Sequence, residues 1–210
     1  MDYTEEEQLE RLKEWWKKNG KFVIAGVVLG LGTVIGMRLW TDSRNQTAEA
    51  ASLQYEQLLQ LVDTGKVEEA EQLAGTLFTQ YSSTPYATLA KLILARLKVE
   101  QGDLAAAEAL LRQVMEGAEQ EAIREIARMR LARVLLAENK PDAAMALLEE
   151  AGTSANQADL EAIKGDIYLA QGKRAEARAA YERALALGGR NQRLLQMRLD
   201  DLAALPADAS

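Results

Sequence analysis

The feature that most restricts this chain is an apolar segment near its N-terminus. Residues 22–37 are sixteen consecutive uncharged residues, and the segment reaches nineteen residues at Trp40 if the Arg38 side chain extends toward lipid headgroups. A helix of that length measures about 28 Å, close to the thickness of the hydrocarbon layer of a bilayer. A buried soluble helix is disfavoured because the segment is apolar on every face. A cleaved signal peptide is disfavoured because the first small-x-small sequence, Ala48 to Ala50, lies about ten polar residues downstream. We therefore expect a transmembrane helix over 22–40.

Aromatic and basic residues flank this segment on both sides. Such side chains favour the interface between lipid and water. Five basic residues precede the segment closely, whereas only Arg38 and Arg44 follow it within the next twenty residues. Because cytoplasmic flanks carry the excess of Lys and Arg, we expect a cytoplasmic N-terminus, a single-pass type II topology and a translocated C-terminal part. The expected membrane-interface anchors are Trp15, Trp16, Lys17, Lys18, Lys21, Arg38 and Trp40.

The leader, residues 1–21, has an amphipathic pattern. Leu9, Leu12, Trp15 and Trp16 fall on one side of a helix, and charged residues occupy the rest. The pattern favours a helix that lies on the cytoplasmic leaflet of the bilayer. A recognition tail for a cytoplasmic protein is the alternative.

Glycine recurs inside the apolar segment at a spacing that suits helix packing. Gly26 and Gly30 form one G-x-x-x-G pattern, and Gly32 and Gly36 form a second. Glycine at this spacing lets a second helix approach closely, so this face is a candidate contact with a membrane partner. The alternative is a face of small residues without a specific interface.

Composition excludes several classes of function. The chain has no cysteine and no histidine, which removes the commonest nucleophiles, acid–base groups and metal ligands. The net charge of -7 argues against nucleic-acid binding, which needs a basic surface. No phosphate-binding loop or nucleophile elbow occurs. We expect neither an enzyme nor a protein that binds a cofactor or metal.

The remainder of the chain repeats a helix–turn–helix pattern. Each turn carries a residue suited to the left-handed conformation that ends a helix, and an alanine follows five residues later. The alanine would allow the second helix of each unit to approach the first closely. The turn residues are Gly65, Gly102, Asn139 and Gly172, at separations of 37, 37 and 33 residues, and the alanines are Ala70, Ala107, Ala144 and Ala177.

This pattern resembles the tetratricopeptide repeat. The last unit matches its consensus best, through Gly165, Tyr168, Gly172, Ala177, Tyr181 and Ala184. Earlier units are degenerate: Ala95 and Ala132 replace Gly165, and Leu111 and Leu148 replace Tyr181. The expected fold is all-α, with a single N-terminal transmembrane helix followed by a tetratricopeptide-like α-solenoid of about four helix pairs and a C-terminal capping helix. The expected division is a leader (1–21), a transmembrane helix (22–40), a translocated repeat domain (41–205), which the family resemblance described below implies is periplasmic, and a frayed tail (206–210).

A column of charged residues stands six positions before the last three turns. Arg96, Arg133 and Asp166 occupy this position, which points toward the groove in this type of repeat, and Leu59 occupies it in the first unit. The three charged residues are candidates for gripping an extended polypeptide. In the alternative interpretation, Arg133 pairs with Asp166 or another acid and holds the units in register.

The joined pattern resembles a family, the YfgM-type ancillary subunit of the bacterial Sec translocon. The resemblance covers the whole chain in order and length and is sharpest between Trp15 and Tyr55. It rests on Trp15-Trp16-x-x-Asn19-Gly20-Lys21, the four glycines of the apolar segment, Arg38-x-Trp40, and Ala50-Ala51-Ser52-Leu53-x-Tyr55 before degenerate repeats.

This resemblance implies a single-span inner-membrane protein of Gram-negative bacteria. It implies association with the Sec translocon channel and with the membrane-anchored periplasmic chaperone PpiD, and transfer of secretory client polypeptides to periplasmic chaperones. Some members of the family are described as restraining a cytoplasmic response regulator, so the resemblance also implies such a regulator as a partner of the leader. The alternative from another class is a membrane-anchored repeat scaffold for cell-envelope assembly or division.

Overall fold

A computed structural model describes residues 5–150, 156–188 and 191–204, with side chains from residue 9 onward. The chain divides into two compact units, Met1–Ala50 and Ala51–Ser210, and the second is called the repeat domain below. Every regular element in the described ranges is a helix, so the all-α prediction is confirmed. The tail predicted to fray, 206–210, lies outside the described residues.

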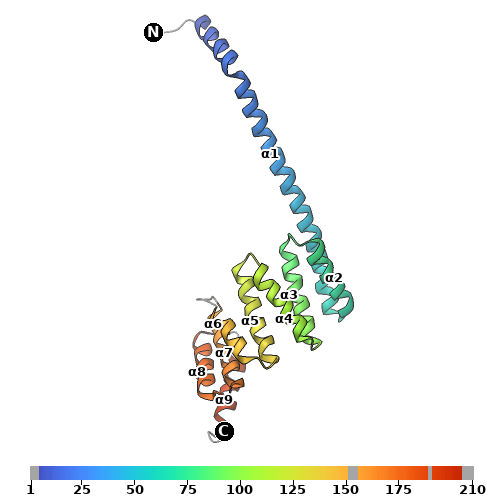
Figure 1. Cartoon of the computed structure of the whole chain (residues 1–210), viewed down its shortest axis with the longest axis vertical. Helices are drawn as coiled ribbons and strands as arrows, with labels where there is room; N and C mark the ends of the chain where they lie inside the picture. The colour runs from blue at the N-terminus through green and yellow to red at the C-terminus, as the bar shows by residue number, and fades with distance from the viewer. Residues whose placement is uncertain (1–4, 151–155, 189–190, 205–210) are drawn as a thin grey trace. The chain divides into compact units, whose positions relative to one another are not determined.

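The described helices follow one another through short connections (Figure 1). They are α1 (Glu5–Asp63), α2 (Val67–Gln80), α3 (Pro85–Glu100), α4 (Leu104–Gly117), α5 (Glu121–Ala137), α6 (Pro141–Glu149), α7 (Gln157–Ala170), α8 (Arg174–Ala186) and α9 (Gln192–Ala204).

The first unit consists of the N-terminal part of α1. Among the described helices, α1 alone is long and apolar enough to cross a membrane. Its large apolar side chains are exposed, including Phe22, Leu29 and Leu31. The polar residues 41–47 continue the helix, so no break in the backbone marks the expected end of the transmembrane helix at Trp40.

The repeat domain is built from helix pairs that end in the same type of turn. Gly65, Gly102, Asn139 and Gly172 all have positive φ, between 60° and 80°, as the sequence predicts. At the first turn, Gly65 N–H donates to Val62 C=O at 3.1 Å, and Lys66 N–H donates to Leu61 C=O at 2.9 Å. The same two bonds recur at the other three turns. This is the Schellman motif, in which a left-handed residue ends the helix and satisfies its last carbonyls.

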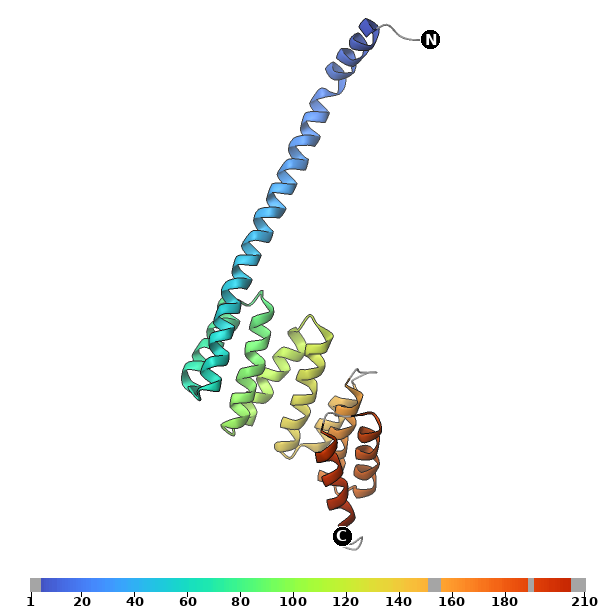
Figure 2. The ribbon, with the colours of Figure 1, turned by 180° about the vertical axis from the view of Figure 1, so that it is seen from behind.

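The predicted alanines lie where the two helices of each pair meet. Ala70, Ala107, Ala144 and Ala177 have no exposed surface. The end of α1 pairs with α2, where Ala51 and Leu58 share a buried cluster with Ala70 and Ala74. The other pairs are formed by α3 with α4, by α5 with α6 and by α7 with α8, and α9 packs against α8. Figures 1 and 2 show these pairs stacked in sequence along the repeat domain, with α9 at its C-terminal end.

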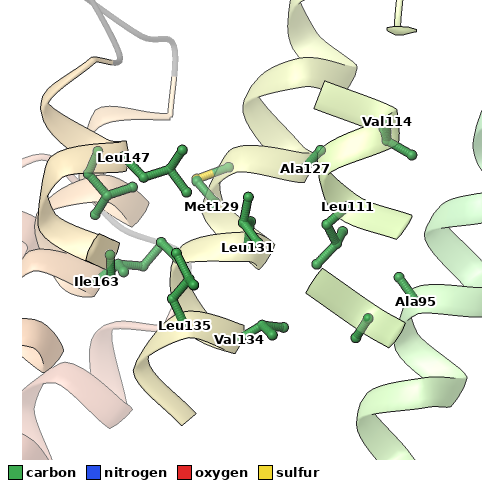
Figure 3. Close-up of a cluster of buried hydrophobic side chains, with 14 of the residues drawn as sticks. Ala95, Leu111, Val114, Ala127, Met129, Leu131, Val134, Leu135, Leu147 and Ile163 are labelled. Carbon is green, nitrogen blue, oxygen red and sulfur yellow. The ribbon is translucent and has the colours of Figure 1, made fainter. Parts of the chain in front are cut away.

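A continuous apolar core joins the middle pairs. Leu131 and Leu135 of α5 are almost fully buried and belong to one cluster with Leu111 of α4 and Ile163 of α7. Figure 3 shows that α5 sends side chains toward both neighbouring pairs. No pair could bury its apolar surface alone, so stacking supplies the stability of the domain.

Polar contacts between neighbouring pairs surround the turns. Glu71 on α2 accepts hydrogen bonds from Lys98 at 2.8 Å and from Gln101 at 2.7 Å, at the end of α3. Gln171, at the end of α7, donates to Asp142 of α6 at 2.8 Å. These two turns thus contact the second helix of the preceding pair, which adds register to the apolar packing.

Candidate functional site

The charged column predicted from the sequence occupies the first helix of three successive pairs. Arg96 lies on α3, Arg133 on α5 and Asp166 on α7. Arg96 and Arg133 line one pocket, and Arg133 and Asp166 line a second. The structure therefore places Arg133 between the two pockets.

The first pocket, called the arginine pocket below, has a volume of about 330 Å³. Its floor is apolar and its rim carries three guanidinium groups. Figure 3 labels Ala95, Leu111 and Val134, which are buried in this floor. The lining residues are Ala95, Arg96, Val99, Leu104, Leu111, Arg130, Arg133, Val134 and Ala137.

Two of these guanidinium groups have no acidic partner among the described residues. Arg96 pairs with Glu100 on its own helix at 2.7 Å. In the part of the chain that the structure describes, Arg130 and Arg133 form no ion pair with a carboxylate, and Arg130 donates only a long hydrogen bond of 3.5 Å to Leu92 C=O. Burial, followed by the nearby charges of Arg133 and Arg96, lowers the pKa of Arg130. The pocket is thus a concentration of positive charge beside an apolar surface.

Sequence reasoning missed Arg130. It lies three residues before Arg133 on α5, a spacing that places two side chains on one face of a helix. This spacing could have identified it once Arg133 was a candidate.

Asp166 has a different environment, because its partners come from the C-terminal end of the domain. It forms an ion pair with Arg198 of α9, and the Tyr181 hydroxyl donates to its Oδ1 at 2.7 Å. Arg198 also donates to the Tyr181 hydroxyl at 3.2 Å. Burial raises the pKa of Tyr181 to about 12. Among the described residues Asp166 pairs with Arg198 of the capping helix, and Arg133 forms no ion pair with it.

The second pocket has a volume of about 340 Å³ and lies between α5, α7 and α9. Its charged side chains are Arg133, Asp159, Asp166 and Arg198. Since Asp166 is bonded to Arg198 and Tyr181, this pocket already contains a matched pair of charges. The electrostatic attraction of this second pocket for a negatively charged ligand is therefore weaker than that of the arginine pocket.

Glu161 of α7 is a buried carboxylate that connects α7 to α8. Arg183 donates to it at 2.6 Å and Lys164 donates at 3.2 Å. Burial would raise the pKa of Glu161, but the hydrogen bonds from Arg183 and Lys164 outweigh burial and hold it below its ordinary value of 4.5. Folding therefore stabilises the charged carboxylate.

The Glu161 contacts predict a stability that depends on pH. A pKa that is lower in the folded state contributes stability above about pH 4.5, and this contribution is lost as the pH falls through the folded pKa. Glu161→Gln is expected to destabilise the domain by about 1–3 kcal/mol at pH 7, because it leaves Arg183 and Lys164 without a charged acceptor. Denaturant unfolding at pH 7 and pH 3.5 measures both effects. The difference in the free energy of unfolding between wild type and variant should be smaller at pH 3.5 than at pH 7. An equal difference at both pH values would contradict a stabilising role for the charged Glu161 carboxylate.

The predicted membrane-interface residues are exposed on α1. Trp15, Trp16 and Trp40 are at least half exposed, and Arg44 stacks over the Trp40 ring at 4.9 Å. Lys17, Lys18, Lys21 and Arg38 are also exposed. The Trp16 ring covers Gly20, where an added Cβ would lie 3.2 Å from it.

The predicted partner face of the apolar segment is open. A Cβ added at Gly26, Gly30, Gly32 or Gly36 would meet nothing within 4 Å. The face therefore has room for a close helix neighbour.

The fold defines a class: an all-α repeat protein with an N-terminal helix that can cross a membrane. Within the described ranges, no group of three or more acidic, His or Cys side chains is placed to hold a metal ion. Residues 13–204 match the family described as "Tetratricopeptide repeat-like domain".

Curated relatives cover nearly the whole chain. The relative from Haemophilus influenzae is 32% identical over 94% of this chain and 97% of its own length. The relative from Aggregatibacter actinomycetemcomitans is 33% identical over 96% of this chain and 100% of its own length. The relative from Escherichia coli is 31% identical over 85% of this chain and 86% of its own length. All three are named "Ancillary SecYEG translocon subunit". The chain belongs to this family of tetratricopeptide repeat-like proteins, which confirms the family resemblance.

Solved structures support the fold alone. A tetratricopeptide repeat protein from Parabacteroides merdae aligns with a TM-score of 0.57 at 21% identity, over 73% of this chain and 57% of the other. A kinesin light chain with TPR-like repeats from Podosopora anserina aligns with a TM-score of 0.58 at 20% identity, over 74% and 85%.

Proposed function

We propose that this protein is an inner-membrane subunit associated with the Sec translocon. Residues 22–40 span the membrane once, the leader (1–21) is cytoplasmic, and the translocated part (41–205) is periplasmic. The observation that carries the proposal is the 32–33% identity, over nearly the full length, to proteins named as translocon subunits. The apolar segment of α1 and the excess of basic residues before it support the topology.

The repeat domain acts by binding and not by catalysis. It holds secretory polypeptides as they emerge and transfers them to the periplasmic chaperone network through PpiD. Anchoring beside the channel confines the domain within tens of Å of the emerging chain, which raises its effective concentration to roughly millimolar. Weak contacts then suffice, and clients able to fold can leave.

Gly26, Gly30, Gly32 and Gly36 supply the contact with the channel inside the bilayer. Their open face supports this assignment, because close packing of two membrane helices needs small residues on one side. The membrane helix would then determine which channel protein is bound, and the repeat domain would determine which client is bound.

Site-specific crosslinking tests the proposal. Because the chain has no cysteine, Ala137→Cys at the edge of the arginine pocket creates a single reactive thiol. A membrane-impermeant thiol crosslinker applied to spheroplasts during secretion should yield adducts with translocon components and with nascent secretory chains. Impermeant reagent reaches only the outer side of the membrane, so the adducts also report orientation.

The matched control is Glu176→Cys on the exposed surface of α8. It should react equally with a small impermeant maleimide and give fewer client adducts. A thiol that becomes accessible only after membrane lysis would contradict the topology. Adducts with one folded envelope protein and no nascent chains would favour the scaffold alternative.

A further inference from the structure

The arginine pocket combines two properties that a structural role does not require. Its floor includes Val99, which is 41% exposed, beside the buried Leu111 and Val134. Its rim carries Arg130 and Arg133, whose charges are not matched by a carboxylate in the described ranges. Neighbouring like charges disfavour one another, so this arrangement costs stability.

The second helices of the pairs offer a comparison for this charge distribution. Acidic residues outnumber basic ones by 32 to 25, and arginines on the outer helices do have partners. Arg112 pairs with Glu108 at 2.7 Å, and Arg178 pairs with Glu182 at 3.1 Å. An acidic protein that leaves two pocket arginines unpaired offers electrostatic complementarity to a negatively charged ligand.

We propose that the arginine pocket binds an extended polypeptide segment in which an acidic side chain lies two residues from an apolar side chain. Residues i and i+2 of an extended chain point to the same side, so one segment can present both groups to one surface. The apolar side chain occupies the floor formed by Val99, Leu111 and Val134. The carboxylate accepts charge-assisted hydrogen bonds from Arg130 and Arg133.

The pocket discriminates by charge as well as by apolar contact. A lysine in place of the acidic residue would meet three guanidinium groups, so basic segments are rejected. Arg96 has a smaller share in the contact because Glu100 already accepts from it. This inference rests on the proposed function, because it specifies which segments of an emerging chain the repeat domain holds.

Peptide binding to the full-length protein in zwitterionic nanodiscs tests the inference. The probe is a fluorescent peptide, acetyl-Gly-Ser-Asp-Ser-Leu-Ser-Asp-Gly-amide, whose blocked ends leave only side-chain carboxylates. Fluorescence anisotropy should give a dissociation constant of roughly 100 µM, which tethering near the channel would offset. The matched peptide with Asn at both Asp positions should bind about tenfold more weakly, and raising the salt should weaken only the Asp peptide.

The protein variants separate a binding role from a structural one. Arg130→Gln with Arg133→Gln should weaken binding of the Asp peptide about tenfold while leaving the melting temperature unchanged or higher, because like-charge repulsion is relieved. Arg112→Gln with Arg178→Gln removes the same charge from the outer helices and should leave binding unchanged.

Equal affinity for the Asp and Asn peptides would overturn the inference. So would an equal loss of affinity for the Asp peptide in the pocket double variant and in the control double variant. Crosslinking to translocon components, measured in spheroplasts through the Ala137→Cys thiol, is expected to persist in the Arg130 and Arg133 variant. Failure of peptide binding with intact translocon adducts would therefore reject the pocket assignment and leave the proposed function standing. Loss of both adduct types in wild type would instead reject the proposed function.

Discussion

Gly165→Ala is expected to destabilise the repeat domain by about 2–3 kcal/mol, although alanine is normally the better residue inside a helix. A Cβ at this position would lie 2.3 Å from the Tyr181 ring. The ring cannot move away easily, because its hydroxyl is bonded to Asp166 at 2.7 Å and to Arg198 at 3.2 Å. Urea unfolding followed by circular dichroism measures the loss.

The other repeats provide the compensating change. Where Gly165 is replaced by Ala95 or Ala132, the tyrosine position holds Leu111 or Leu148. Tyr181→Leu combined with Gly165→Ala should therefore be more stable than the sum of the single losses predicts, with a coupling of about 1–2 kcal/mol. Strictly additive effects would show that the contact does not determine the residue pair.

Gly75→Ala on α2 is the matched control for this series. A Cβ at Gly75 would meet nothing within 4 Å, so only the backbone effect remains. The substitution should stabilise the domain by about 0.5–1 kcal/mol. A loss of stability for Gly165→Ala and a gain for Gly75→Ala would separate the effect of side-chain overlap from that of helix propensity.

Leu29→Arg with Leu31→Arg is expected to remove the chain from the membrane. An arginine near the centre of a membrane helix costs about 2.5–3.5 kcal/mol on insertion scales, so two would cost about 6 kcal/mol. Both leucines are exposed in the middle of the apolar segment, so an arginine there would face lipid. Extraction of membranes with alkaline carbonate should release the variant and retain wild type.

The same two substitutions placed in the leader form the control. Leu9→Arg with Leu12→Arg adds equal charge to exposed positions of α1 outside the apolar segment. This variant should stay in the carbonate-resistant fraction. If the variant with arginines at positions 29 and 31 also stayed there, the apolar segment would not be the membrane anchor.

Local rules explain which parts of the fold could be predicted. A left-handed residue is needed wherever a helix must end tightly, so Gly65 and Asn139 identify their turns from sequence alone. The close approach of two helices requires a small side chain, so Ala107 and Ala177 identify buried contacts. Both signals depend on a few neighbouring residues, and both were confirmed.

Partners of charged side chains could not be predicted in this way. Asp166 is paired with Arg198, which is 32 residues away in the sequence and belongs to a different helix. Arg183 reaches Glu161 across the α7–α8 pair. Such pairs depend on how far each helix is rotated about its axis, which periodicity does not determine to within the reach of a side chain.

The way in which α9 is attached limits how the protein can assemble. Leu195 and Leu199 of α9 are buried in one cluster with Tyr181, and Arg198 secures the same helix through Asp166. A stack of repeats that ended at α8 would expose the apolar surface around Tyr181. Identical subunits could then join end to end through this surface into filaments. α9 covers this apolar end instead, so the buried Tyr181 and its neighbours in the cluster are not available to a second molecule.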